Sequence, residues 1–176
     1  MSKVSRKWFV LVVSVVCVAT VQAQEPPQPG AEHKKLKELE GTWDAVVKMG
    51  EGESKATMVY KMDLGGLWLV GDFTSDFAGQ KFTGKGLDSY DPIKKKYVSV
   101  WFDSISTSPM VMEGTFDKDG KVLTMTGEGP GQDGKPTNFR TTTEHKDKDT
   151  MFWTMYGSGP DGKDVPMLSI TYKRRK

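Results

Sequence analysis

The residues with the most evident chemical use lie at the end of one strand-like segment, where Trp101 and Asp103 precede a hydroxyl-rich loop, residues 104–108. Alternate side chains of a strand share a face, so Asp103 points the same way as Trp101. If that face is the inside of a barrel, a carboxylate stands at the barrel mouth and can anchor the polar head of a ligand. The alternative is a carboxylate satisfied by Arg140 or by backbone amides, as buried carboxylates usually are.

Two other residue types could hold a metal or a cofactor. His145 shares the parity of Phe139, which would let it enter a lumen as a haem ligand, although a lone histidine on a polar strand is usually solvated. Asp-x-Asp pairs offer the oxygen ligands of a calcium site. A lysine interrupts each pair, and hairpin turns explain the aspartates without a metal, so we predict neither metal nor cofactor. The aspartates are Asp117, Asp119, Asp147, Asp149 and Asp161.

Motifs of the common catalytic sites are absent from the sequence. There is no His-x-x-x-His pair, no cysteine ligand set and no Gly-x-Ser-x-Gly motif. The glycine pairs at 84/86 and 127/129 lie in strand-like segments and lack the helix start that a phosphate-binding loop needs. We therefore assign no catalytic residue. An enzyme that uses Asp103 would need Arg140 or His145 in the same pocket.

Residues 1–23 are typical of a cleavable signal peptide. Lys3, Arg6 and Lys7 precede an apolar run over residues 8–21, and the segment ends in Val-Gln-Ala, with Ala23 at the expected cleavage position. The run is short for a membrane span, which needs roughly 20 apolar residues, so an uncleaved anchor is the less favoured alternative. We expect export to the periplasm or the medium, with no stable membrane insertion after cleavage.

Removal of residues 1–23 changes both the charge and the cysteine content. The full chain has 25 basic residues, 23 acidic residues and one cysteine, Cys17; without the three basic residues of the signal segment, 22 remain against 23, a net charge of −1. A nearly neutral domain has no global attraction for nucleic acid or for an anionic membrane, so no nucleic-acid partner is expected. A chain of this length can bury roughly two-thirds of its surface in one core.

The predicted elements are a linker, one helix and ten strands. Prolines in residues 24–30 favour extended chain. Helix-forming residues over 31–39 place Leu36 and Leu39 on one side. Beyond Gly41 the helical period ends, and turn residues separate strand-like runs. The predicted strands are 42–49, 55–62, 67–75, 81–90, 96–104, 110–117, 122–128, 138–146, 151–156 and 167–173.

The number and spacing of these strands predict the fold class. Short strands without intervening helices favour antiparallel neighbours, and closure removes the exposed edges of an open sheet. We therefore predict an all-β fold: an antiparallel up-and-down barrel of about ten strands over residues 31–176, with one short N-terminal helix. Its many methionines suit either a filled core or an apolar cavity. The candidate lumen residues are Trp43, Met58, Trp101, Asp103, Met125, Arg140 and Trp153.

The start of the first strand carries a resemblance. Gly41-Thr42-Trp43, directly after the short helix, resembles the Gly-x-Trp start of lipocalin-like (calycin) barrels. That resemblance implies that Trp43 closes one barrel end against a basic side chain of the last strand, Lys173 or Arg174, with the cation over the indole.

Several blocks of sequence carry a second resemblance. They are His33-Lys34-Lys35-Leu36, Gly41-x-Trp43, Gly84-x-Gly86, Tyr90-Asp91-Pro92, Lys96-Tyr97-Val98, Trp101-x-Asp103-Ser104 and Ile170-Thr171-Tyr172-Lys173-Arg174. Their order and spacing resemble the secreted bacterial family catalogued as domain of unknown function 1579. The resemblance covers nearly all of the chain after residue 23, and Ser89 departs from the glycine expected before Tyr90. It implies a lipocalin-like barrel and assigns no catalytic residues.

The leading functional hypothesis is a non-enzymatic barrel that binds a small apolar or amphiphilic molecule, with Asp103 as the polar anchor. The alternative is a packed envelope or surface domain that acts through protein contacts, without a ligand. The sequence leaves the oligomeric state open.

Cleavage after Ala23 can be tested directly. The exported protein, purified from the envelope fraction or medium of its own host, should have the intact mass of residues 24–176. A mass that includes residues 1–23 would contradict this prediction and favour the uncleaved anchor.

Overall fold

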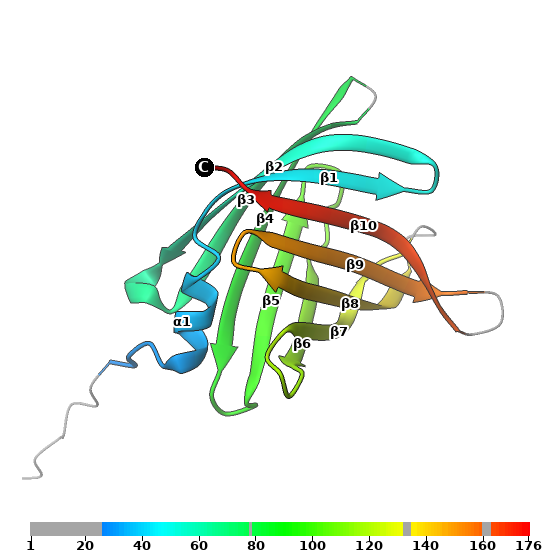
Figure 1. The fold of residues 1–176 in the computed structure, drawn as a ribbon. Coiled ribbons are helices and arrows are strands. Elements are labelled where there is room, and N and C mark those ends of the chain that lie inside the picture. Colours follow the sequence, from blue (N-terminus) through cyan, green and yellow to red (C-terminus); the bar gives the residue numbers. More distant parts are fainter. Residues whose placement is uncertain (1–25, 78, 132–134, 160–162) are drawn as a thin grey trace, which may run out of the picture.

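Ten antiparallel strands close into a barrel (Figure 1). The computed structural model describes residues 26–77, 79–131, 135–159 and 163–176, so the predicted signal peptide lies outside the described residues. Strands that are neighbours in sequence pair with each other, and β1 (Gly41–Met49) pairs with β10 (Asp164–Arg174) to close the sheet. This arrangement confirms the predicted up-and-down barrel.

The elements follow the predicted order. All ten predicted strands are present, and the helix ends at Lys37 instead of residue 39. No helix within the described ranges is long and apolar enough to cross a membrane. Besides β1 and β10, the elements are α1 (Ala31–Lys37), β2 (Gly52–Asp63), the 3-10 helix η1 (Leu64–Gly66), β3 (Trp68–Phe77), β4 (Gln80–Asp91), β5 (Lys96–Asp103), β6 (Met110–Phe116), β7 (Val122–Pro130), β8 (Pro136–Asp147) and β9 (Thr150–Ser158).

Several strands are longer than predicted because a paired neighbour extends the ladder. β2 starts at Gly52 instead of residue 55, since a tight turn through Gly50 brings Gly52 opposite Met49. Gly50 has a φ of 57°, a left-handed conformation that glycine adopts without steric cost. The turn residues are visible in the sequence, but pairing with β1 decides where the turn ends.

Helix α1 closes one end of the barrel (Figure 1). Its buried Leu36 packs with Leu69, Tyr97, Met112 and Met125, which come from four different strands. A row of aromatic rings lies at the same end: His33–Tyr90, Tyr90–Tyr97, Tyr97–Phe116 and Phe116–His145, with centroids 6.4, 5.2, 5.2 and 5.5 Å apart. We refer to α1 and these rings as the floor, and to the opposite end of the barrel as the mouth.

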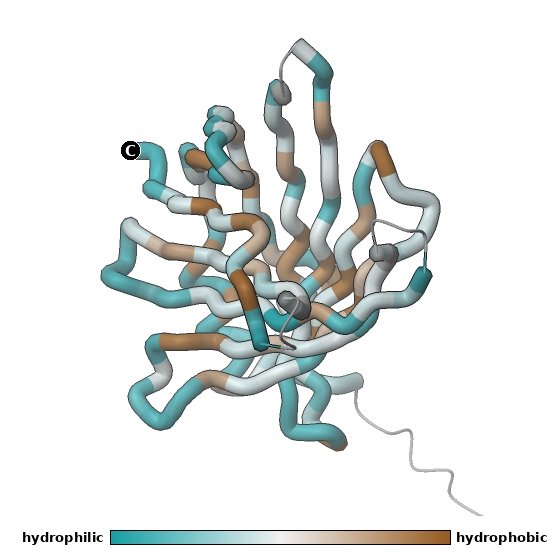
Figure 2. Tube along the Cα trace, turned by 90° about the vertical axis from the view of Figure 1, so that its right-hand side faces the viewer, coloured by the Kyte–Doolittle hydropathy of each residue, from teal (hydrophilic) through white to brown (hydrophobic). Residues whose placement is uncertain are grey.

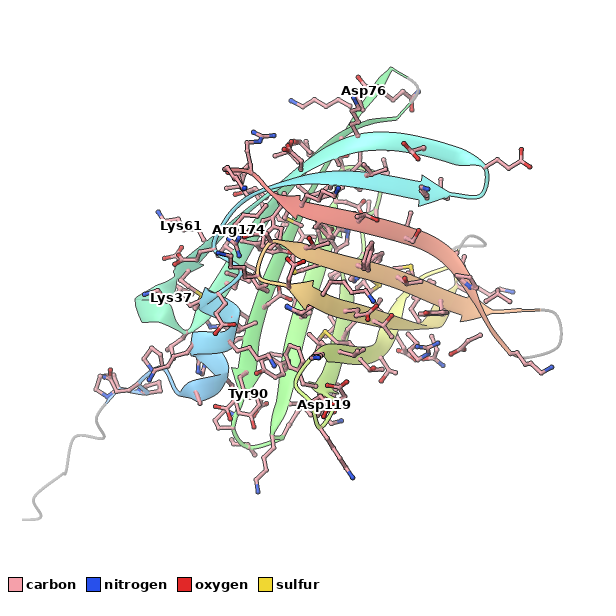
Figure 3. All side chains as sticks on the ribbon, in the orientation of Figure 1. Lys37, Lys61, Asp76, Tyr90, Asp119 and Arg174 are labelled. Carbon is pink, nitrogen blue, oxygen red and sulfur yellow. The ribbon has the colours of Figure 1, made fainter. Side chains whose placement is uncertain are left out.

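Trp43 and Arg174 join the floor to the strands that close the barrel. Figure 3 labels Arg174 near the end of α1. The guanidinium carbon of Arg174 lies 4.1 Å from the centroid of the Trp43 ring. This is the contact that the calycin resemblance implied, with Arg174 and not Lys173 as the cation. The guanidinium also donates hydrogen bonds to the carbonyls of Glu40 (2.5 Å), Glu38 (2.6 Å) and Lys148 (3.1 Å).

Buried side chains inside the barrel form two clusters. One contains Trp43, Met58, Met151 and their neighbours on β1, β2, β3, β9 and β10. The other surrounds Leu36 of helix α1, at the floor, and Tyr60 packs against both clusters. Figure 2 shows hydrophobic and hydrophilic positions alternating along the strands, with hydrophilic positions gathered at the hairpins. The first cluster covers the inner face of β1, β2, β9 and β10, and the second covers the part of the inner face next to α1.

Arg174 should matter more to stability than its neighbour Arg175. Arg174→Ala removes the stacking on Trp43 and three hydrogen bonds, which should lower the free energy of unfolding by about 2–4 kcal/mol. Arg175→Ala is the matched control, because Arg175 pairs with Asp44 on the surface and such a pair contributes about 0–1 kcal/mol. Urea unfolding followed by tryptophan fluorescence measures both variants. Equal losses would contradict the role of Arg174 in closure.

Candidate ligand site in the barrel lumen

The inner wall is fully buried at some positions and accessible at others. Trp43 and Leu69 are 1% and 0% exposed. Other inward-facing side chains are only half-buried and keep part of their surface accessible to solvent. These half-buried residues are Tyr60, Phe82, Trp101, Trp153, Met155 and Leu168.

Glycines on β3 and β4 lie along one side of the lumen. Gly71 and Gly86 lie opposite each other and face inward. A Cβ on Gly71 would lie 2.9 Å from Cε1 of Tyr60, and one on Gly84 would lie 2.2 Å from Cζ2 of Trp101. The two rings therefore lie against bare backbone, a close approach that a strand permits only at glycine.

Asp88 stands one layer above the floor, inside the barrel. On one side it lies opposite Ser99, next to the Tyr90–Tyr97 pair of the floor. On the other side it lies opposite Leu69, which is fully buried. The Ser99 hydroxyl is the polar group that interacts with its carboxylate and lowers the pKa of Asp88. In the part of the chain that the structure describes, no basic side chain pairs with Asp88.

The environment of Asp88 disfavours its charged form. Burial raises the pKa of Asp88 from 3.8 to about 6, and the hydrogen bond from Ser99 opposes the rise. Burial also raises the pKa of Tyr60, and the nearby Tyr172 and Asp88 add to that shift. The pKa of Tyr172 is raised by burial and then by the charge of Asp88. Three oxygen-bearing side chains from β2, β4 and β10 thus act on one another across the lumen.

Most of the predicted lumen residues lie on the inner face. Trp43, Met58 and Met125 are buried and belong to the packed wall. Trp101 and Trp153 are half-buried and keep accessible surface. Whether these residues bind a ligand stays a prediction.

Asp103 lies at the mouth and is satisfied by its own neighbours. Its carboxylate accepts hydrogen bonds from Nε1 of Trp101 (3.0 Å) and from the backbone amide of Ile105 (3.0 Å). Of the two alternatives for Asp103, the structure shows bonding to adjacent groups and no contact with Arg140. Its two carboxylate oxygens are each used within the protein.

The prediction that Arg140 lies in the lumen was wrong. Side chains alternate along β8, and Thr141, which is 3% exposed, takes the inward position next to it. Arg140 therefore points outward, where its guanidinium carbon lies 3.8 Å from the centroid of the Tyr156 ring. Its Nε donates to Asp164 at 2.5 Å.

Both histidines belong to the floor. Nδ1 of His33 accepts a hydrogen bond from the Gly30 amide (3.1 Å), and the His33 ring packs edge-on against Tyr90. His145 packs on Phe116, and burial lowers the pKa of His145. Asp103 at the mouth therefore shares a pocket with neither His145 nor Arg140. The catalytic combination of these groups is not assembled.

The aspartates of the Asp-x-Asp pairs serve hairpin turns. Oδ1 of Asp117 accepts hydrogen bonds from the amides of Val122 and Lys121, which lower the pKa of Asp117. Oδ1 of Asp147 accepts from the amide of Asp149 (2.8 Å). Asp161 lies outside the described residues, and among those described no three metal-ligating side chains gather.

Comparison with known proteins places the chain in a family. The family model described as "Protein of unknown function (DUF1579)" matches residues 28–174. The chain belongs to this family. The match confirms the resemblance seen in the sequence blocks, which lie within the matched residues. None of the curated proteins compared matches the chain.

Two solved structures resemble this DUF1579 barrel. Rv2717c from M. tuberculosis has a TM-score of 0.61 at 14% identity, over 84% of this chain and 99% of that chain. A redesigned beta barrel has a TM-score of 0.43 at 13% identity, over 80% of this chain and 95% of that chain. The likeness to Rv2717c supports the barrel fold of this DUF1579 member and nothing about its ligand.

The residues predicted for the lumen of this DUF1579 barrel did not include two inner-face residues, Asp88 and Tyr172. A usable signal existed for Asp88, because Gly84, Gly86 and Asp88 alternate on one face of β4. The sequence alone does not show whether this face points into the barrel or outward, since apolar residues occupy both faces of β4. The register with Gly71 and Leu69 of β3 decides that this face is the inner one.

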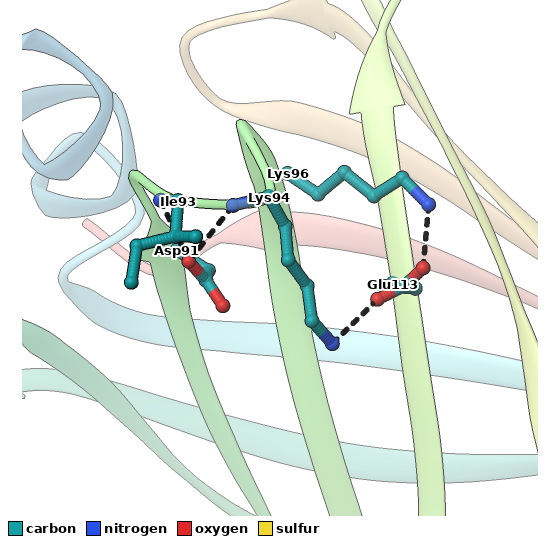
Figure 4. Close-up of polar contacts among 5 residues, drawn as sticks. All are labelled: Asp91, Ile93, Lys94, Lys96 and Glu113. Atoms are coloured by element: carbon teal, nitrogen blue, oxygen red, sulfur yellow. Dashed lines mark hydrogen bonds and ion pairs between the residues drawn. The ribbon is translucent and has the colours of Figure 1, made fainter.

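A groove lies on the outer surface. It has a volume of about 680 Å³ and is lined mainly by outward-facing residues of β5 to β9 that include Val98, Val111, Arg140 and Tyr156. At its edge, Lys96 and Lys94 both bind the carboxylate of Glu113, which lowers the pKa of Glu113 (Figure 4). The charges around this groove are thus largely neutralised by one another.

Asp88 should make stability depend on pH. Because its pKa is higher in the folded than in the unfolded chain, its contribution is fully present below about pH 4 and is lost as the pH rises through about 6. The rise from 3.8 to about 6 corresponds to at most about 3 kcal/mol. Asp88→Asn removes this titration. The free energy of unfolding of the variant should therefore increase relative to that of the wild type as the pH rises from about 4 to about 6.

Urea unfolding of both proteins across this pH range measures the difference. Titration of His145 and of the surface carboxylates is common to both and cancels. A difference that stays constant with pH would contradict the buried position of Asp88.

Proposed function

We propose that the barrel binds a small amphiphilic molecule in its lumen, with the apolar part of the ligand against the half-buried aromatic wall. The observation that carries this proposal is the wall itself: inward-facing Tyr60, Trp101 and Trp153 keep accessible surface inside a closed barrel. Sites for small molecules combine such apolar walls with a few polar groups. Here the polar groups are Asp88 and the hydroxyls near it, and they take the anchoring role first expected of Asp103.

The size of the expected affinity follows from the apolar part of the ligand. Burial of each methylene contributes about 0.8 kcal/mol, so a chain of about eight carbons contributes about 6 kcal/mol. This corresponds to a dissociation constant in the range of tens of micromolar before the costs of association. A simple alkyl probe such as 1-octanol is therefore sufficient to detect the site.

Filling the lumen should abolish binding. A Cβ on Gly86 would meet its nearest neighbours at 3.7 Å, so Gly86→Met can extend a longer side chain into the lumen. Lys85→Met is the matched control, since Lys85 is exposed on the outer face of the same strand. We expect Gly86→Met to weaken 1-octanol binding by about tenfold or more, measured by titration calorimetry, and Lys85→Met to leave it unchanged.

Native mass spectrometry of the protein from its own envelope fraction, before and after solvent extraction, provides an independent readout. Mass that leaves on extraction from the wild type and is absent from Gly86→Met supports the lumen site. A protein that loses no mass on extraction and does not bind 1-octanol contradicts the proposal.

The outer groove favours a second candidate function, a domain that acts through protein contacts. Val111, on the groove, is 53% exposed, an unusual position for an aliphatic side chain in the middle of a sheet. Under this alternative, Val111→Lys would abolish association with a partner protein in cross-linking, and Gly86→Met would not.

A further inference from the structure

We infer that the ligand of the lumen is a cationic amine with an apolar body, and that Asp88 binds its ammonium group. This inference rests on the proposed function and names the class of ligand. It follows from the position of Asp88, from its missing counter-charge and from the rings around it.

The carboxylate of Asp88 lacks a counter-charge within the protein. Ser99 is its one recorded polar partner among the described residues. Asp88 is half-buried. A carboxylate partly withdrawn from water is stabilised by a cation or by several hydrogen-bond donors, and an isolated one is costly. Asp103 is the matched contrast on the same face of the next strand, since two donors already occupy its carboxylate. Asp88 is therefore the carboxylate left to receive a charge from outside the protein.

The position of Asp88 suits the deep end of an elongated ligand. Leu69 lies opposite it on the neighbouring strand and the Tyr90–Tyr97 pair lies on its floor side, so a ligand that enters from the mouth would meet Asp88 with its leading end. Toward the mouth, Gly86 and Gly71 carry no side chain, and the rings of Trp101 and Tyr60 lie next to them. A chain that descends through the lumen places its terminal group at Asp88 and its apolar part beside the exposed rings.

Aromatic and hydroxyl groups around Asp88 complete a site for an ammonium ion. Tyr60 and Tyr172 are close enough for their pKa values to respond to the charge of Asp88. Their oxygens can accept hydrogen bonds from an ammonium, and the faces of Tyr60 and Trp101 attract cations. A carboxylate head group would instead meet the like charge of Asp88, and an alcohol would gain one hydrogen bond without charge pairing.

A panel of three probes with the same tail separates these cases. n-Octylammonium, 1-octanol and octanoate are titrated by calorimetry into the wild type, Asp88→Asn and Asp103→Asn. We expect the wild type to bind octylammonium at least about tenfold more tightly than 1-octanol, and octanoate most weakly. Asp88→Asn should reduce the preference for the ammonium to about onefold, and Asp103→Asn should retain it.

Each other outcome overturns a defined part of the argument. If 1-octanol binds as tightly as octylammonium, or if Asp88→Asn keeps the preference, the amine inference fails and the lumen site stands. If none of the three probes binds, the proposed function fails and the inference fails with it. If Asp103→Asn removes the preference, the anchor is at the mouth and Asp88 is not the site.

A pH series on the wild type keeps the test decisive if Asp88→Asn does not fold. Octylammonium stays charged from pH 5 to 7.5, so its preference over 1-octanol should fall below about pH 6 as Asp88 takes up a proton. A preference that is constant across this range overturns the inference. Other titratable or charged groups on the inner face are Tyr60, Tyr90, Tyr97, Asp103, His145, Tyr172 and Arg174. Of these, His145 lies at the floor, where burial lowers its pKa.

Discussion

The pairing of β1 with β10 is the constraint on which the remaining features depend. Once these strands pair, the barrel has no free edge, and alternation sorts the side chains of every strand into an inner and an outer set. Trp43 and Arg174 lie opposite each other in this ladder. The stacking that joins the floor to the wall is therefore a product of the same pairing, and the lumen has a defined inside only because of it.

Stability and open space are supplied by different parts of the barrel. The floor combines Leu36 of α1 with a continuous row of rings, and it is packed and buried. Higher in the barrel, glycines replace side chains at inward positions, and the rings of Tyr60 and Trp101 lie back against them. A barrel of ten strands is wide enough that its interior is not filled automatically. The glycine positions decide where these rings can approach the backbone of the wall.

Asp88 and Asp103 show how two identical residues on one face acquire different roles. Asp103 ends its strand, so a loop amide and the adjacent indole satisfy it. Asp88 lies within a ladder whose backbone donors are already used, and Ser99 alone reaches it. A carboxylate kept in this position lowers the stability of the empty protein at neutral pH. Such local costs are typical of functional sites and are offset by packing elsewhere.

The sequence by itself determined the number of strands and the helix, because turn residues and alternation are local signals. The resemblance at Gly41-Thr42-Trp43 indicated Trp43 as a closing residue, and the structure decided that its partner is Arg174. The sequence also determined which residues share a face, as Trp101 and Asp103 do. Only the tertiary structure decided which face is inside, since that depends on neighbouring strands and on closure. For this reason Arg140 was placed on the wrong side and Asp88 was missed: parity relates residues along one strand, whereas burial and counter-charge depend on residues brought together from several strands.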